Sequence, residues 1–133
     1  MDVDCTSTPS FALGYKKILD VGTFTKLDDD SLLDITFNGR IYVESFAGGS
    51  TGAKFELRVD DNPSTNGRAR TTLKISEVGG SGILASIKGI FTGLDAGSHT
   101  VSIWVSTFYG TGTKAMVDHG CWDSDHIVVM EFK

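Results

Sequence analysis

The sequence lacks the features that mark several classes of protein. No apolar run approaches the ~20 residues that a membrane-spanning helix requires, and no segment keeps a helical spacing of apolar residues over three turns. Basic residues are also few, because 12 Lys and Arg stand against 17 Asp and Glu and leave a net charge of −5. Nucleic-acid binding requires a basic surface. The chain is therefore predicted neither to insert into a membrane nor to bind nucleic acid.

The densest basic patch is short. It consists of Arg68 and Arg70, with Lys74 nearby. Charged clusters between strands are usually solvated, so this patch is interpreted as a solvated hairpin tip.

Cysteine and proline are scarce as well. The two cysteines, Cys5 and Cys121, stand near opposite ends of the chain. A bridge between them would close a loop of about 116 residues and stabilise the fold by ~4–5 kcal/mol. Two buried free thiols are the alternative, and two isolated cysteines leave both open. Sixteen glycines against two prolines indicate tight turns rather than a disordered linker.

Apolar and polar residues alternate through most of the chain. Clear examples are KFELRV at 54–59 and HTVSIWVST at 99–107, where Trp104 points opposite to the apolar face. Clusters rich in glycine and aspartate separate these runs. The pattern predicts an all-β fold, a jelly-roll β-sandwich of about 8–10 short antiparallel strands. Residues 11–133 are expected to form one domain behind an N-terminal arm, residues 1–10.

Two segments allow more detailed predictions. The alternating runs at 33–37 and 41–43 flank Asn38-Gly39, a pair that favours a two-residue type I′ hairpin turn. The last run, HIVVMEF at 126–132, is apolar on both faces. Such a strand is expected at the centre of a sheet, or at a position also covered by a partner.

The segment before this last run is dense in residues that can bind zinc: Asp118, His119, Cys121, Asp123, Asp125 and His126. Zinc sites use three or four such ligands in a tetrahedron. The spacing matches no zinc signature, and a bridge would consume Cys121. The segment is interpreted as a polar turn that leads into the last strand.

Calcium and catalysis are considered on similar grounds. Asp28-Asp29-Asp30 and Asp60-Asp61-Asn62 offer oxygen ligands, but neither fits an EF-hand loop. No cofactor is expected, with calcium bound by separate loops as the open alternative. The chain has no Gly-x-Ser-x-Gly motif, and His99 stands alone at a turn. A non-enzymatic protein is favoured over a small β-sandwich hydrolase.

Several ordered motifs carry a family resemblance. They are TFTK at 23–26, SLLDITFNGRIYV at 31–43, VSIWVST at 101–107 and CWDSDHIVVME at 121–131. Together they resemble the C-terminal domain of the collagen triple helix repeat-containing protein 1 family. GLDAGSHTVSIWV at 93–105 is also similar to the trimeric jelly rolls of tumour necrosis factor and complement globular heads. Similar heads occur at the tips of bacterial and phage collagen-like fibres.

The resemblance implies a secreted, extracellular homotrimer that follows a collagen-like stalk and binds an extracellular protein or glycan. A head of this kind sets the register of the three stalk chains. The sequence departs from the family in its few cysteines, in Asn62-Pro63, which blocks a glycosylation sequon, and in the absence of a Gly-X-Y repeat. The alternative function is a receptor- or glycan-binding, lectin-like tip of a virion or cell-surface fibre.

Aromatic side chains are the candidates for subunit or partner contacts, because such residues anchor interfaces and sugar-binding sites. The predicted contact residues are Trp104, Phe108, Tyr109, Trp122 and Phe132.

Overall fold

The computed structural model describes residues 5–8, 14–45, 51–64, 67–75, 79–109, 114–118 and 126–133. Every regular element in these ranges is a β-strand. No helix long and apolar enough to cross a membrane occurs in this part of the chain.

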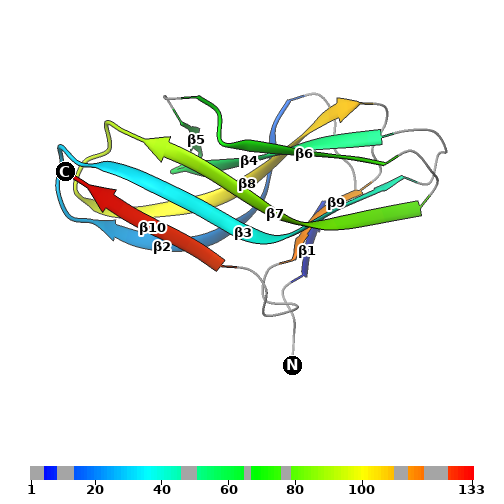
Figure 1. Cartoon of the computed structure of the whole chain (residues 1–133), viewed down its shortest axis with the longest axis horizontal. Helices are drawn as coiled ribbons and strands as arrows, with labels where there is room; N and C mark the ends of the chain where they lie inside the picture. Colours follow the sequence, from blue (N-terminus) through cyan, green and yellow to red (C-terminus); the bar gives the residue numbers. More distant parts are fainter. Residues whose placement is uncertain are drawn as a thin grey trace.

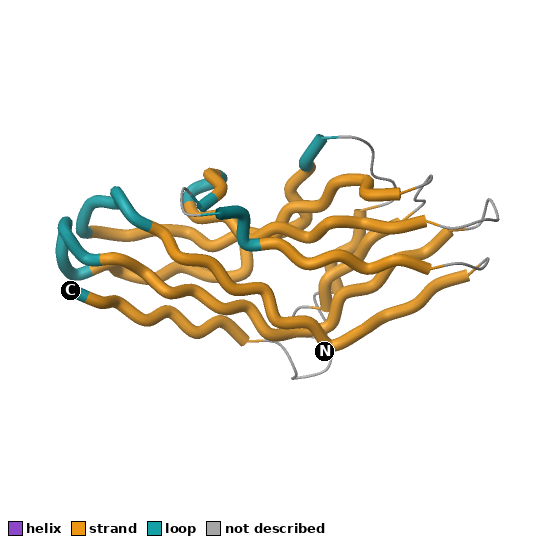
Figure 2. The backbone as a smooth tube through the Cα atoms, turned by 45° about the horizontal axis from the view of Figure 1, so that its top comes forward, coloured by secondary structure: helices purple, strands orange, loops and turns teal. Residues whose placement is uncertain are grey.

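The ten strands of the described ranges form two antiparallel sheets that pack face to face (Figures 1 and 2). The first sheet has the order β1-β9-β3-β10, with β7 paired to β3. The second has the order β2-β8-β4-β5, with β6 paired to β4. The strands are β1 (Cys5–Thr8), β2 (Lys16–Lys26), β3 (Leu32–Ser45), β4 (Thr51–Val59), β5 (Asn62–Pro63), β6 (Arg70–Ile75), β7 (Gly79–Phe91), β8 (Gly97–Tyr109), β9 (Lys114–Asp118) and β10 (His126–Phe132). This architecture confirms the predicted all-β sandwich.

The core lies between the sheets and follows the alternation of the sequence. On β4, Phe55 and Leu57 are fully buried, and Ile103 on the neighbouring β8 is buried with them. Ile35 and Phe37 of β3 face them from the other sheet and are equally buried. Because successive side chains of a strand point to opposite faces, the residues between these positions form the outer faces of the sandwich.

The predicted hairpin at Asn38-Gly39 is wrong. β3 runs without a break from Leu32 to Ser45, and β7 pairs with it across the whole stretch, Gly39 facing Ala85. The apolar residues before and after Asn38-Gly39 share the same parity, so the period of two continues through the pair. A hairpin would have discarded the pairing of this long strand with β7, and that pairing outweighs the local turn preference.

The predicted central position of the last strand is also wrong. β10 pairs only with β3 among the described residues, at Leu32 to Asn38, while β9 continues along the same edge of β3. The strand therefore lies at the edge of its sheet (Figure 1). An apolar pattern shows which faces of a strand are covered. It does not show how many neighbouring strands bond to its backbone, so it cannot distinguish a central strand from an edge strand.

The N-terminal part of the chain contributes a strand. Within the predicted arm, β1 pairs with β9, and Cys5 lies opposite Asp118 in the register. Cys121 lies outside the described residues, so its pairing with Cys5 stays a prediction.

The outer face of β3 carries one large aromatic residue, Tyr42. It pairs with Gly82 of β7, and its ring extends toward Gly80. A Cβ atom added to Gly80 would overlap the Tyr42 hydroxyl. The phenol therefore occupies the space where a side chain at position 80 of β7 would otherwise stand.

Candidate functional site

The outer face of the second sheet carries a row of charged and aromatic residues. The register places Lys17 of β2 beside Trp104 of β8, Trp104 beside Glu56 of β4, and Glu56 beside Arg70 of β6. In β4 and β8, the residues directly before and after the member of this row face the core. The alternation that builds the core therefore aligns this row across four strands.

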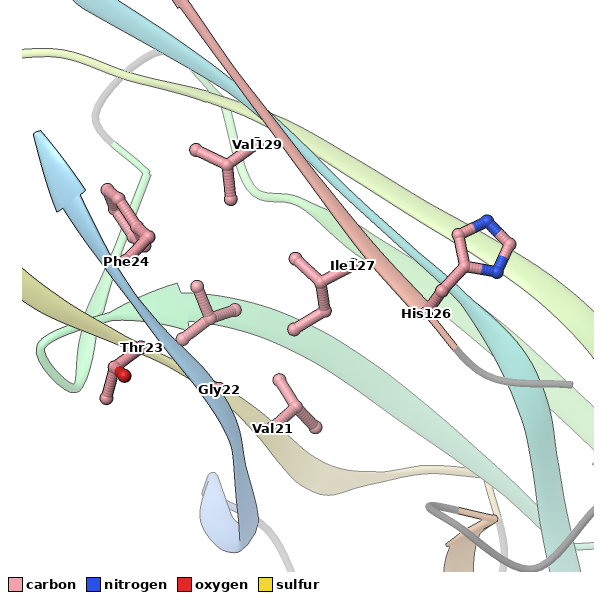
Figure 3. Close-up of a pocket in the computed structure, with 8 residues that line it drawn as sticks. Val21, Gly22, Thr23, Phe24, His126, Ile127 and Val129 are labelled. Atoms are coloured by element: carbon pink, nitrogen blue, oxygen red, sulfur yellow. The ribbon is translucent and has the colours of Figure 1, made fainter. Parts of the chain in front are cut away.

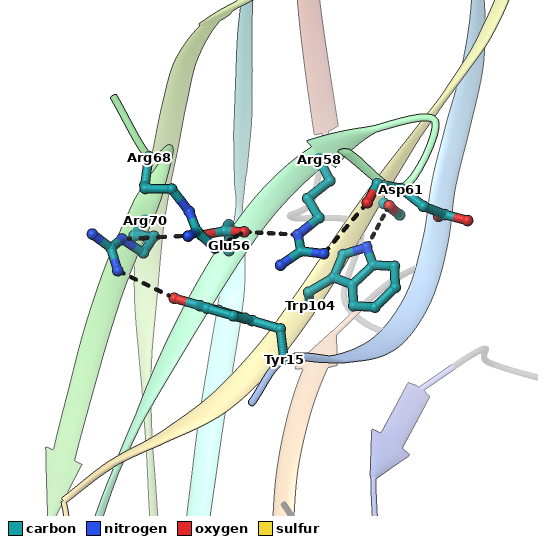
Figure 4. A network of polar contacts seen from close by, with 8 residues as sticks. Tyr15, Glu56, Arg58, Asp61, Arg68, Arg70 and Trp104 are labelled. Atoms are coloured by element: carbon teal, nitrogen blue, oxygen red, sulfur yellow. Dashed lines mark hydrogen bonds and ion pairs between the residues drawn. The ribbon is translucent and has the colours of Figure 1, made fainter. Parts of the chain in front are cut away.

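Glu56 is at the centre of the row and is fully buried although it faces outward. Its carboxylate accepts hydrogen bonds from Arg58 Nε at 2.7 Å and from Arg68 Nε and Nη2 at 2.5 and 2.7 Å (Figure 4). Arg70 Nε lies 4.0 Å from the same group. Three guanidinium groups thus surround one carboxylate, and positive charge is in excess.

Two aromatic rings hold these arginines in place. The guanidinium carbon of Arg58 lies 4.4 Å from the ring centroid of Trp104 and 5.0 Å from that of Tyr15. Arg68 also lies 5.0 Å from the Tyr15 ring. Contacts of this length are favourable cation–π interactions. We call Tyr15, Glu56, Arg58, Arg68, Arg70 and Trp104 the Glu56 cluster.

The ionisation of Glu56 follows from these contacts. Burial raises the pKa of Glu56, but the hydrogen bonds from Arg68 and Arg58 outweigh this effect and hold the pKa below its usual value. The hydrogen bond to Glu56 raises the pKa of Arg68. The Glu56 carboxylate and the Arg68 guanidinium are therefore both charged at neutral pH.

The interpretation of Arg68 and Arg70 as a solvated hairpin tip holds only in part. Both side chains are exposed, but they lie on the outer face beside Glu56, and Ala69 between them is buried. The sequence carried one signal for this arrangement: Glu56, Arg58, Arg68 and Arg70 all occupy outward positions of alternating runs. Their convergence depends on the pairing of β4 with β6, which the alternation does not specify.

The outer face of the other sheet is apolar beside β10. Val128, Met130 and Phe132 are 42%, 46% and 47% exposed, and Leu32 lies opposite Phe132 on β3. We call these four residues the β10 apolar face. Ile127, on the opposite side of the same strand, packs against the core.

A single carboxylate interrupts the β10 apolar face. Asp34 lies between Met130 and Ile90 in the register and is only 8% exposed. Its Oδ2 lies 3.0 Å from Lys88 Nζ, a largely exposed group. Its Oδ1 is buried and has no hydrogen-bond partner among the described residues. The two outer faces therefore differ in how they satisfy a covered carboxylate.

A pocket of about 370 Å³ opens between the edge strands β2 and β10 (Figure 3). Val21 and Phe24 line it from β2, and Ile127 and Val129 line it from β10. His126 points away from these apolar side chains and approaches Asn38 Nδ2 at 3.2 Å. The pocket is an apolar gap between the edges of the two sheets.

The acidic turns considered for calcium are occupied by contacts within the chain. Asp28 pairs with Lys133 and accepts a hydrogen bond from Asp30 N at 2.9 Å. Asp29 accepts a hydrogen bond from Ala96 N at 2.6 Å.

The second acidic turn is engaged in the same way. Asp60 pairs with His99 at 2.6 Å and accepts a hydrogen bond from Thr100 N, while Asp61 pairs with Lys17 at 2.7 Å. The hydrogen bond to Asp60 raises the pKa of His99. No group of three His, Cys, Asp or Glu side chains placed to hold a metal occurs in the described ranges.

The candidate zinc ligands are placed only in part. His126 opens β10, and the backbone of Asp118 ends β9. His119, Cys121, Asp123 and Asp125 lie outside the described residues.

The predicted contact aromatics are not brought together. Trp104 lies on the outer face of the second sheet and Phe132 on the outer face of the first. Trp122 and the side chains of Phe108 and Tyr109 lie outside the part of the chain that the structure describes. Trp104 is partly covered by Arg58 of its own chain, a contact that the sequence did not predict.

Comparison with known proteins identifies the fold. The C-terminal domain of EclA, a sugar-binding protein, is 12% identical and superposes with a TM-score of 0.50, covering 98% of this chain and 79% of that one. At this identity the likeness shows a shared β-sandwich fold and nothing further.

Two structures of infectious bursal disease virus also resemble the chain, one of the Gt strain and one of the VP2 subviral particle. They are 13% and 14% identical, with TM-scores of 0.30 and 0.31, and cover 100% and 96% of this chain. The chain spans only 36% and 34% of those chains, and scores this low do not indicate a shared fold.

No protein-family model and no curated protein matches the chain. The relation to the collagen triple helix repeat-containing family therefore stays a hypothesis.

Proposed function

We propose that this chain is a non-enzymatic globular head that binds copies of itself through the β10 apolar face. One observation carries the proposal. Val128, Met130 and Phe132 are about half exposed on an edge strand whose other face packs into the core. Single exposed apolar residues are ordinary, but a contiguous row on two paired strands is typical of an interaction surface.

One further feature supports a second copy as the occupant. The pocket lined by Ile127 and Val129 reaches the other side of the same strand. An assembly formed around β10 would cover both the β10 apolar face and this pocket.

The resemblance to trimeric jelly-roll heads favours a homotrimer for this assembly. In the same proposal the head follows a collagen-like stalk, lies outside the cell and binds an extracellular protein partner. A location on a virion or a cell-surface fibre is the alternative. The compact trimer would hold three stalk chains in register.

Light scattering of the purified chain at micromolar concentration tests the assembly. Three chains of 14.3 kDa give a mass of about 43 kDa. Met130→Glu places a charge in the contact and should yield the monomer mass. Thr72→Glu, at an exposed position of β6 in the other sheet, adds the same charge away from β10 and should stay trimeric. A monomer mass for the unmodified chain would contradict the proposal.

Glycan binding is the second candidate function, and the Glu56 cluster favours it. Aromatic rings beside fixed hydrogen-bond donors are typical of sugar-binding sites. The structural neighbour described as a sugar-binding protein lends further support. Screening the chain on a glycan array tests this function, and Trp104→Ala should abolish the signal. A chain that binds no glycan on the array would exclude it.

A further inference from the structure

We infer that the Glu56 cluster binds anionic saccharides, through their carboxylate or sulfate groups. The inference rests on glycan binding as the second candidate function, and it names the class of glycan. It concerns the outer face of the second sheet and is independent of the assembly through β10.

The first argument is the local charge. Arg58, Arg68 and Arg70 face a single carboxylate, Glu56, so the cluster keeps an excess of positive charge in a chain whose net charge is −5. The cluster is therefore a local site of attraction for an anion on a chain of net negative charge.

The second argument is the fixed geometry of the guanidinium groups. Arg68 donates from Nε and Nη2 to Glu56, which orients the plane of its guanidinium. Arg58 is held by Glu56 and packs against the rings of Trp104 and Tyr15. Because these side chains are already ordered, binding an anion costs little conformational entropy. Planar guanidinium groups also match the paired oxygens of carboxylates and sulfates.

The third argument is the degree of exposure. The side chains of Arg68 and Arg70 are 36% and 40% exposed, so they are open to a ligand, while Glu56 is covered. Glu56 is thus a positioning residue: it orients the arginines but does not itself face the ligand.

The surroundings favour a saccharide over an extended polyanion. Asp20 and Asp61 flank Lys17 on β2 and limit the positive area on that side. Within the cluster, Tyr15 and Trp104 are half-buried and contact Arg58, so the part of each ring that stays exposed is what a sugar ring can pack against. A ligand with one or a few charges and apolar C–H faces fits this combination, whereas a long nucleic-acid backbone would meet the acidic border.

Binding to matched saccharides tests the inference. Oligosaccharides with the same backbone are compared in neutral, carboxylated and sulfated forms, with a single-stranded DNA oligonucleotide as a polyanion that is not a sugar. We expect at least one acidic form to bind about tenfold or more tightly than the neutral form. The comparison of the two acidic forms identifies which anion is preferred.

Variants locate the site. Arg68→Gln should weaken binding of the acidic form about tenfold, and Arg70→Lys should weaken it severalfold because it keeps the charge but loses the planar fork. Lys133→Gln removes one charge from an exposed lysine that pairs with Asp28 and should change binding less than about twofold. Circular dichroism confirms that each variant is folded. If Arg68→Gln does not fold, the binding of Arg70→Lys tests the inference in its place.

The possible failures are distinguishable. Equal binding of neutral and acidic forms would overturn the inference and leave glycan binding intact. Binding of no saccharide at all would overturn both. DNA binding as tight as that of the acidic saccharide, or full binding by Arg70→Lys, would mean a nonspecific positive patch and would also overturn the inference.

Discussion

The two outer faces of the sandwich each cover one carboxylate, and they treat it in opposite ways. Glu56 is enclosed by arginines that donate three hydrogen bonds of normal length, whereas Asp34 has one exposed lysine and a buried oxygen with no partner among the described residues. A covered charge is stable only where enough donors accompany it. Within the described residues, the carboxylate of the first face is therefore fully satisfied, whereas that of the second face is satisfied only in part.

This difference is consistent with the two kinds of interaction that we propose. The Glu56 cluster is hydrogen-bonded, charged and partly exposed, which suits a small charged ligand. The β10 apolar face is uncharged apart from Asp34 and continues to the edge of its sheet, which suits a protein surface. In both cases the core alternation fixes which residues are available to the outer face.

The largest effect on stability is expected from removing the carboxylate of Glu56. Glu56→Ala leaves three guanidinium groups close together without their counter-ion and should lower the free energy of unfolding by about 2 kcal/mol. Urea titration followed by circular dichroism measures this. The double variant Glu56→Ala with Arg68→Ala should lose less than the sum of the two single changes, because the pair acts as a unit. Simple additivity would mean that the two groups do not interact.

The second largest effect is expected from acid, which should lower the stability that Glu56 contributes. The folded-state pKa of Glu56 lies below its ordinary value, so the stability it contributes is present above the unfolded pKa of about 4.3 and is lost as pH falls through the folded pKa. Between pH 5 and pH 2 the unmodified chain should therefore lose more stability than Glu56→Gln, which cannot titrate at this position. Parallel curves for the two chains would show that Glu56 is not stabilised as a carboxylate.

The smallest effect is expected from the other carboxylate. Asp34→Ala removes an oxygen that lacks a partner and a pair with an exposed lysine, so the stability of the monomer should change by less than about 0.5 kcal/mol or increase. Because Asp34 lies within the proposed contact between copies, the measurement is made at a dilution at which light scattering gives the monomer mass. A loss as large as that of Glu56→Ala would remove the distinction between the faces.

Much of the fold was predictable because one face of each strand is buried. The alternation at Phe55 and Leu57, and around Ile103, fixed strands, core positions and the outward direction of Trp104. The Asn38-Gly39 turn failed because a local preference was weighed above the unbroken parity from Phe37 to Ile41. The period of two predicts which face of a strand each residue occupies. The prediction failed where the choice lay between a turn and a continuing strand.

The candidate sites were less predictable, since they depend on which strands pair. Glu56 meets Arg68 and Arg70 only because β4 pairs with β6, and it meets Trp104 only because β4 pairs with β8. The exposure of β10 depends on its position at an edge, which its apolar pattern did not reveal. Such contacts join distant segments, and alternation alone does not choose among the possible strand orders.

The phenol of Tyr42 and the missing side chain of Gly80 have a consequence for the history of this fold. Because the Tyr42 ring covers the position of a Cβ on Gly80, a larger residue at position 80 requires the ring to move or to be replaced by a smaller side chain. Among natural relatives, a larger residue at position 80 should therefore occur with a small one at position 42. The order of change is one-way, since a smaller residue at position 42 meets no clash while Gly80 is kept.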